Sequence, residues 1–158
     1  MPQGVVKPSN QIVAYGEPLM VEMEIGANAT AAEMKAGRVV IFDDADQTVK
    51  EAGAAAANVV GFLEVDPAKT KSTAYAVGDQ AKVVIGECLA VLTLLASESV
   101  ARGDALICAA DGKLAKQAVG AMGEQGQVVA YSWETSNVTV DAEILVHWKP
   151  SAEPAAAA

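Results

Sequence analysis

The stretch that decides the fold contains three phrases, GECLAVL at Gly86–Leu92, VARGDALI at Val100–Ile107 and ADGKL at Ala110–Leu114. Short apolar runs separated by Gly and Asp predict a strand, a polar connection, a second strand and a tight turn. The first half of the chain contains similar phrases in the same order. GEPLMV at Gly16–Val21 matches the first phrase. AGRVVI at Ala36–Ile41 matches RGDALI at Arg102–Ile107, which is part of the second phrase.

The correspondence continues to the end of both halves. Asn58–Phe62 matches Gln127–Tyr131, and Ala81–Ile85 matches Ala142–Val146. Few positions are identical, so the evidence is the shared order of the matches, which predicts an internal duplication. The predicted organisation is an extended N-terminal arm at 1–15, a first β repeat at 16–85, a second β repeat at 86–149 and a flexible Ala/Pro tail at 150–158.

Many short strands joined by turns predict a mainly all-β chain, a sandwich or barrel built from the two tandem repeats. Leu19–Ile25 alternates strictly between apolar residues on one face and Met20, Glu22 and Glu24 on the other, which is typical of a half-buried strand. The Ala-rich stretches leave room for short helices. Whether the repeats form one body or two is open at this stage.

Composition limits the classes of partner. The chain has 158 residues, of which 52% are apolar, and a net charge of −9. Such an acidic surface repels phosphate, so no nucleic-acid partner is expected. The longest apolar run, Cys88–Ala96, is too short to span a bilayer, and no basic segment followed by an apolar one opens the chain. We therefore expect no membrane partner and synthesis in a cytoplasm.

Catalytic and cofactor motifs are not found in the sequence: nucleophile elbow, Walker loop, His-Glu-x-x-His and dinucleotide fingerprint are all missing. No catalytic residue, cofactor or metal is predicted. Cys88 and Cys108 match Pro18 and Phe42 of the first repeat, which indicates buried apolar packing in preference to a disulfide. With a single histidine, the two cysteines are too few for a zinc site.

Three other polar features have a structural interpretation. Asp43–Asp46 is expected to form a hairpin turn, and the alternative calcium loop lacks its central Gly and closing Glu. Glu17 and Glu87 occupy matching places in the two repeats. We interpret them as turn carboxylates that cap backbone N–H groups, in preference to a pair of catalytic acids. His147 has no partner in its motif and is expected to be a surface or hydrogen-bonded strand histidine.

Two groups of apolar residues are candidates for partner contact. The arm carries apolar residues between Pro and Gly, so we expect it to be mobile in the free protein and ordered on a partner. The match places Leu92 and Leu94 on Glu22 and Glu24, so both faces of that strand are apolar and need a cover from the other repeat, another subunit or the partner. The candidate partner-binding residues are Val5, Val6, Ile12, Val13, Leu92 and Leu94.

The phrases VARGDAL at Val100–Leu106, ADGKL at Ala110–Leu114 and VVAY at Val128–Tyr131 resemble those of tailed-phage head decoration, or capsid cement, proteins. The resemblance implies a non-enzymatic structural protein on the outer surface of the virion. It further implies binding to the assembled major capsid protein, stabilisation of the shell, and a homotrimer or another homo-oligomer.

Two alternatives come from other classes. Val100–Leu106 also resembles the phrase that follows the modified lysine in biotinyl and lipoyl carrier domains, and Met34-Lys35 supplies a Met-Lys pair. In those carriers, however, the lysine lies in a hairpin between symmetric halves, and Lys35 has no counterpart in the second repeat. The other alternative is a β-sandwich adhesion or carbohydrate-binding module.

Overall fold

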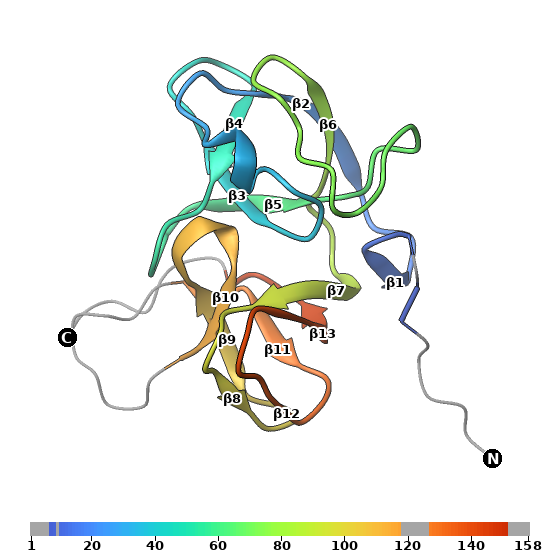
Figure 1. Ribbon diagram of the computed structural model, residues 1–158, viewed down its shortest axis with the longest axis vertical. Coiled ribbons are helices and arrows are strands. Elements are labelled where there is room, and N and C mark those ends of the chain that lie inside the picture. Colours follow the sequence, from blue (N-terminus) through green and yellow to red (C-terminus); the bar gives the residue numbers. More distant parts are fainter. Residues whose placement is uncertain (1–6, 9, 118–126, 152–158) are drawn as a thin grey trace.

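The computed structural model describes residues 7–8, 10–117 and 127–151, and its regular structure is nearly all β (Figure 1). Two small barrels lie one above the other along the long axis, the first formed by β2 to β6 and the second by strands from β7 onward. The predicted all-β class is therefore confirmed. No helix in the described part of the chain is long and apolar enough to cross a membrane.

The first barrel closes in the order β2-β4-β3-β5-β6. Its strands are β2 (Met20–Ile25), β3 (Val39–Phe42), β4 (Thr48–Glu51), β5 (Val59–Leu63) and β6 (Gln80–Val84). β2 and β4 run parallel, and the remaining pairs are antiparallel. A single turn of 3-10 helix, η1 (Ala31–Glu33), lies between β2 and β3.

The second barrel closes in the order β7-β10-β9-β11-β13, with β13 paired back to β7. Its strands are β7 (Cys88–Leu94), β9 (Ala105–Cys108), β10 (Leu114–Lys116), β11 (Ala130–Ser132) and β13 (Ala142–Trp148). β7 and β10 run parallel and the other pairs antiparallel. The additional elements are β1 (Val13–Tyr15) against β7, the β8 (Ser99–Val100) and β12 (Ser136–Asn137) ribbon, and η2 (Ala110–Gly112).

The order of strand pairing is the same in both barrels. The first strand runs parallel to the third, and the fifth strand closes the ring on the first. Ile25 lies opposite Val49 as Leu94 lies opposite Leu114. Because Val49 also pairs with Phe42, and Leu114 with Cys108, the pairings make Ile25 the equivalent of Leu94.

This register corrects the sequence match by one residue. If Leu94 is equivalent to Ile25, Leu92 is equivalent to Met23 and not to Glu22. A shift of one residue moves every side chain of a strand to the opposite face. Leu92 and Leu94 therefore point into the second barrel, and both have an exposed fraction of 0%. The cover that these leucines need is supplied by the chain itself, so they are not available to a partner.

The two barrels pack against one another through one hydrophobic cluster, which we call the shared core. It joins Val39, Phe62 and Val84 of the first barrel to Leu92 and Trp148 of the second. The first barrel also has a separate cluster of its own, which includes Met23, Ile25 and Val83. The Phe62 and Trp148 rings meet edge to face with centroids 5.0 Å apart. Backbone bonds cross the same boundary, from the Gly112 N–H to the Ala52 carbonyl at 2.7 Å and from the Ala55 N–H to the Cys108 carbonyl at 2.9 Å.

The described end of the N-terminal arm belongs to the same core. Ile12 and Val13 have exposed fractions of 1% and 8%, and β1 pairs antiparallel with β7. The surface on which this part of the arm docks is therefore the chain's own body, and the expectation of a mobile arm is wrong for Ile12 and Val13. Val5, Val6 and the tail residues 152–158 lie outside the described residues.

Candidate partner-contact surface

The outer face of the second barrel carries a row of exposed rings. Tyr15 lies opposite Leu89, Leu89 opposite His147, and His147 opposite Tyr131, across β1, β7, β13 and β11. Residues directly opposite one another on neighbouring strands share a face of the sheet. Neighbouring strands of the row are about 4.8 Å apart. We call Tyr15, Leu89, His147, Tyr131 and the adjacent Trp133 the aromatic row.

The rings of the aromatic row are accessible to solvent. Tyr15 is 71% exposed, Trp133 47% and Tyr131 38%. The row therefore contains three of the seven aromatic residues that make up the Phe, Tyr and Trp content of the chain. Exposed Tyr and Trp supply large apolar contact area together with a polar tip, which suits them to binding surfaces.

His147 is fixed in the middle of the aromatic row. Its Nε2 lies 2.6 Å from Oε1 of Glu87, and its ring meets the Trp133 ring edge to face with centroids 5.9 Å apart. The prediction of a hydrogen-bonded strand histidine is confirmed. Its partner, Glu87, comes from the turn before β7 and makes a side-chain contact in place of the expected backbone cap.

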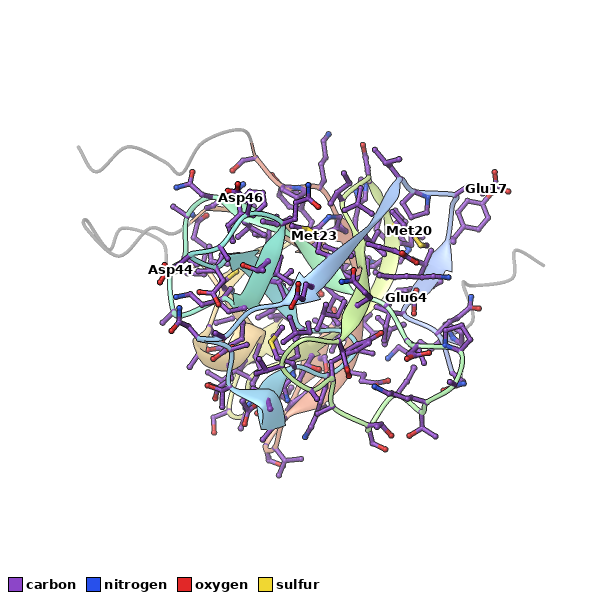
Figure 2. All side chains as sticks on the ribbon, turned by 90° about the horizontal axis from the view of Figure 1, so that it is seen from above. Glu17, Met20, Met23, Asp44, Asp46 and Glu64 are labelled. Carbon is purple, nitrogen blue, oxygen red and sulfur yellow. The ribbon has the colours of Figure 1, made fainter. Side chains whose placement is uncertain are left out.

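The first barrel presents a separate feature at the β3–β4 turn. Asp43–Asp46 connects these antiparallel strands, so the predicted hairpin turn is confirmed. The side-chain amide of Asn28 donates to Asp43 at 2.8 Å, and this bond is the main cause of the lowered pKa of Asp43. Figure 2 shows Asp44 and Asp46 on the side of the molecule away from Glu17. Among the described residues, no three His, Cys, Asp or Glu side chains gather as a metal site.

Both cysteines are buried and free of a disulfide, as expected for packing residues. Burial raises the pKa of the Cys88 thiol and of the Cys108 thiol to about 12. A thiol with such a pKa stays protonated at neutral pH, and the thiolate is the nucleophilic form. These two side chains therefore pack and do not supply a reactive group.

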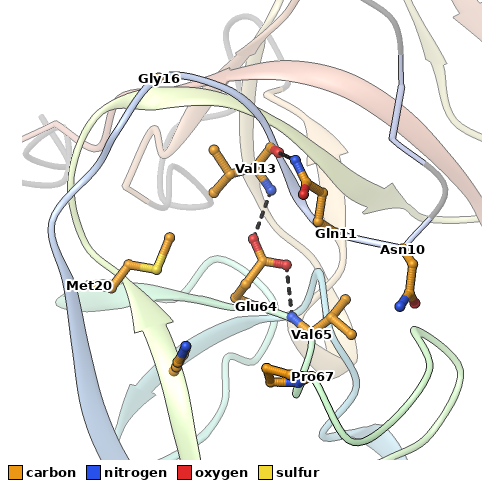
Figure 3. A pocket seen from close by; sticks show the side chains of 9 residues that line it. Asn10, Gln11, Val13, Gly16, Met20, Glu64, Val65 and Pro67 are labelled. Carbon is orange, nitrogen blue, oxygen red and sulfur yellow. Dashed lines mark hydrogen bonds between the residues drawn. The ribbon is translucent and has the colours of Figure 1, made fainter.

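A pocket of about 430 Å³ lies between the arm and the first barrel, lined among others by Gln11, Met20, Glu64 and Lys82 (Figure 3). Glu64 follows β5 directly and is 7% exposed. Its carboxylate accepts backbone N–H groups of the arm, from Ile12 at 2.6 Å and Val13 at 2.9 Å. Sequence reasoning missed Glu64, although a lone carboxylate inside the apolar run Val59–Val65 was a visible signal.

The structure places the six predicted contact residues in two groups. Ile12, Val13, Leu92 and Leu94 are buried in the shared core, whereas Val5 and Val6 lie outside the described residues. None of the four buried residues is part of the aromatic row. The exposed apolar side chains of the described residues are therefore not the ones that the sequence predicted as partner contacts.

Comparison with solved structures finds a similar fold. The chain is similar to the N base of head fiber gp8.5 of bacteriophage phi29, seen in a crystal structure, with a TM-score of 0.50 and 16% sequence identity. The similarity covers 83% of this chain and 95% of that chain. No curated protein sequence matches the chain.

The sequence itself identifies the family. The family described as XM1 gp53 minor capsid protein matches residues 4–149, so the chain belongs to that family. This is a phage head-associated protein, and the predicted relationship to proteins of the tailed-phage head is confirmed.

Proposed function

We propose that this protein is a non-enzymatic decoration protein that binds the assembled major capsid protein on the outer surface of the virion and stabilises the shell. The observation that carries the proposal is the match to a minor capsid protein family over residues 4–149. The absence of catalytic motifs from the sequence agrees with it. A ligand that binds only the assembled state stabilises that state by mass action.

The aromatic row is the contact surface that we propose for the capsid. Exposed Tyr and Trp are the residue types that contribute most to binding energy at protein interfaces. The row extends over β7, β13 and β11 of the second barrel and over β1, which pairs with β7, so its side chains present a preformed surface. A homotrimer, or another homo-oligomer, would present several such rows and bind with high avidity although each contact is weak.

Co-sedimentation with purified capsids that lack this protein tests the proposal. The wild-type chain is expected to pellet with assembled shells and not with unassembled capsid subunits. The double variant Tyr131→Ser with Trp133→Ser should bind at least about tenfold more weakly, since two interface rings are lost. Phe42→Ser removes a ring of the first barrel that is 60% exposed, more than Tyr131 at 38% or Trp133 at 47%, and serves as the control. Failure of the wild-type chain to bind any assembled shell overturns the proposal.

The internal duplication belongs to the same proposal. The two barrels share one order of strand pairing, including the parallel pair between first and third strands. This agreement supports descent of both halves from a single barrel unit. On that interpretation Phe62, which pairs through Val84 with Met20, stands in the first copy where Tyr131 stands in the second, but Phe62 is buried against the second barrel.

A carbohydrate-binding module is the second candidate function, and the aromatic row favours it too, because sugars also stack on exposed Tyr and Trp rings. A glycan array separates the two: binding to glycans that is lost in the Tyr131→Ser, Trp133→Ser variant would favour this candidate. A carrier domain has less support. Lys35 is half-buried in the connection between η1 and β3 and not in a hairpin, and an intact mass equal to that of the unmodified chain would exclude it.

A further inference from the structure

Glu64 holds the arm by its carboxylate. The carboxylate accepts three backbone N–H groups, from Ile12 at 2.6 Å and Val65 at 2.8 Å on Oε1, and from Val13 at 2.9 Å on Oε2. Figure 3 shows the carboxylate between the arm and the strand end, with Val13 on one side and Val65 on the other. Two of the three donors belong to the arm, so a single side chain fixes two consecutive residues of it.

The carboxylate of Glu64 uses three of its four lone-pair positions as acceptors for backbone N–H groups, two on Oε1 and one on Oε2. Hydrogen bonds to an ionised acceptor are about twice as strong as neutral ones. Within the described residues Glu64 makes no ion pair with Lys, Arg or His, so its charge is stabilised by backbone dipoles.

Other titratable groups face Glu64 from each neighbouring element. Lys82 of β6 lines the same pocket, Cys88 begins β7, and the Tyr75 hydroxyl donates to the Glu64 backbone carbonyl at 2.7 Å. The Gln11 amide is turned away, since it donates to the Val13 carbonyl at 2.8 Å. None of these groups replaces the carboxylate as an acceptor for the arm, because Lys is only a donor and the Tyr75 hydroxyl is already used.

The arm has other attachments besides Glu64. β1 pairs with β7 at Val13 and Tyr15, and the Ile12 carbonyl accepts the Val91 N–H at 2.9 Å. Nearer the start of the chain, Lys7 Nζ lies 2.6 Å from Glu134 Oε1, and Lys71 Nζ donates to the Pro8 carbonyl at 3.0 Å. Without the carboxylate, however, the N–H groups of Ile12 and Val13 would be buried without an acceptor, which is costly.

We propose that Glu64 is a charge-dependent anchor that docks the N-terminal arm on the body. The anchor holds Ile12 and Val13 in place through their backbone N–H groups. A consequence that rests on the proposed function is that capsid contacts of the arm depend on Glu64, which acts as a positioning residue.

Hydrogen exchange of individual amides, measured by NMR on the full chain, tests the anchor. Glu64→Gln keeps the size of the side chain and removes its charge. The protection factors of Ile12 and Val13 should fall at least about tenfold, while those of Leu92 and Val146 in the core stay unchanged. Glu51→Gln is the matched control, because the exposed Glu51 carboxylate also accepts a backbone N–H, from Thr30 at 3.0 Å. Unchanged protection at Ile12 and Val13 overturns the anchor, and so does an equal fall throughout the core.

Capsid co-sedimentation then tests the consequence separately. Equal capsid binding by Glu64→Gln, with a released arm, overturns the positioning role alone, whereas no binding by the wild-type chain overturns only the proposed function.

Discussion

Leu92 occupies in the second barrel the position that Met23 occupies in the first. Leu92 lies opposite Ile144 on β13, and Met23 lies opposite Ala81 on β6. Both side chains point inward, with exposed fractions of 0% and 7%. Their outward neighbours differ in burial, because Glu22 is exposed while Val91 is covered by the arm and the first barrel.

The first prediction concerns charge inside the second barrel. Leu92→Glu places a carboxylate in a core without a partner, and we expect it to lower the free energy of unfolding by about 3–5 kcal/mol or to prevent folding. Glu22→Leu with Glu24→Leu changes only exposed positions and should change stability by less than about 0.5 kcal/mol, with lower solubility. Urea unfolding of both variants checks this, and equal stability of the Leu92 variant and the wild-type chain would contradict the assigned register.

The second prediction concerns the shared core. Phe62→Ala removes a ring that packs on Trp148 across the boundary between the barrels, and it should cost about 3–5 kcal/mol. Because the shared core joins the two barrels, we expect both barrels to unfold in one transition in the wild-type chain and in the variant. Differential scanning calorimetry measures this as equal calorimetric and van't Hoff enthalpies. Two separate transitions would show that the barrels are independent.

Part of this architecture could be predicted from the sequence. Strict alternation at Leu19–Ile25 indicates a half-buried strand, and Asp43–Asp46 between apolar runs indicates a hairpin. These signals are local, because side-chain direction and turn geometry depend on neighbouring residues. The exposed rings could not be grouped in this way, since Tyr15 and Tyr131 become neighbours only through the pairing of β1, β7, β13 and β11.

The register of β7 could not be predicted by matching sequence phrases between the two halves of the chain. The phrases align with Gly16 on Gly86, and only the pairing of Leu94 with Leu114 shows that the strands themselves correspond one residue away from this match. The hydrogen-bond partners of His147 and of the arm could not be predicted either, because they are distant in the sequence. Glu87 lies 60 residues from His147, and Glu64 lies 52 residues from Ile12, so no spacing rule connects them.

The third prediction uses a glycine at the boundary between the barrels. Gly112 has φ +71°, and a Cβ there would lie 2.6 Å from the Val39 carbonyl oxygen. Gly112→Ala is expected to cost at least about 2 kcal/mol, from strain and the clash together. Gly103→Ala is the control, because Gly103 has φ +93° with nothing within 4 Å of an added Cβ. Chemical unfolding should show the larger loss for Gly112→Ala, and equal losses would mean that the boundary tolerates the methyl group.

The last prediction concerns alkaline pH and the two cysteines. Burial raises the pKa of the Cys88 and Cys108 thiols to about 12, from an ordinary value of 9.0. In the unfolded chain both thiols lose their protons near pH 9, whereas in the folded chain they keep them. The unfolded state therefore binds fewer protons between about pH 9 and 12, and the stability that is present below pH 9 decreases as the pH rises through this interval. Tyr75, whose pKa is raised to about 12 by burial first and nearby carboxylates second, adds to the same decrease.

We expect the double variant Cys88→Ala with Cys108→Ala to lose less stability than the wild-type chain between pH 8 and pH 10.5 in urea unfolding under reducing conditions. The wild-type thiols should also react slowly with iodoacetamide at pH 8 until the chain is unfolded. Identical pH dependence of the two chains, together with fast alkylation of the folded protein, would show that these thiols are accessible and not part of the core.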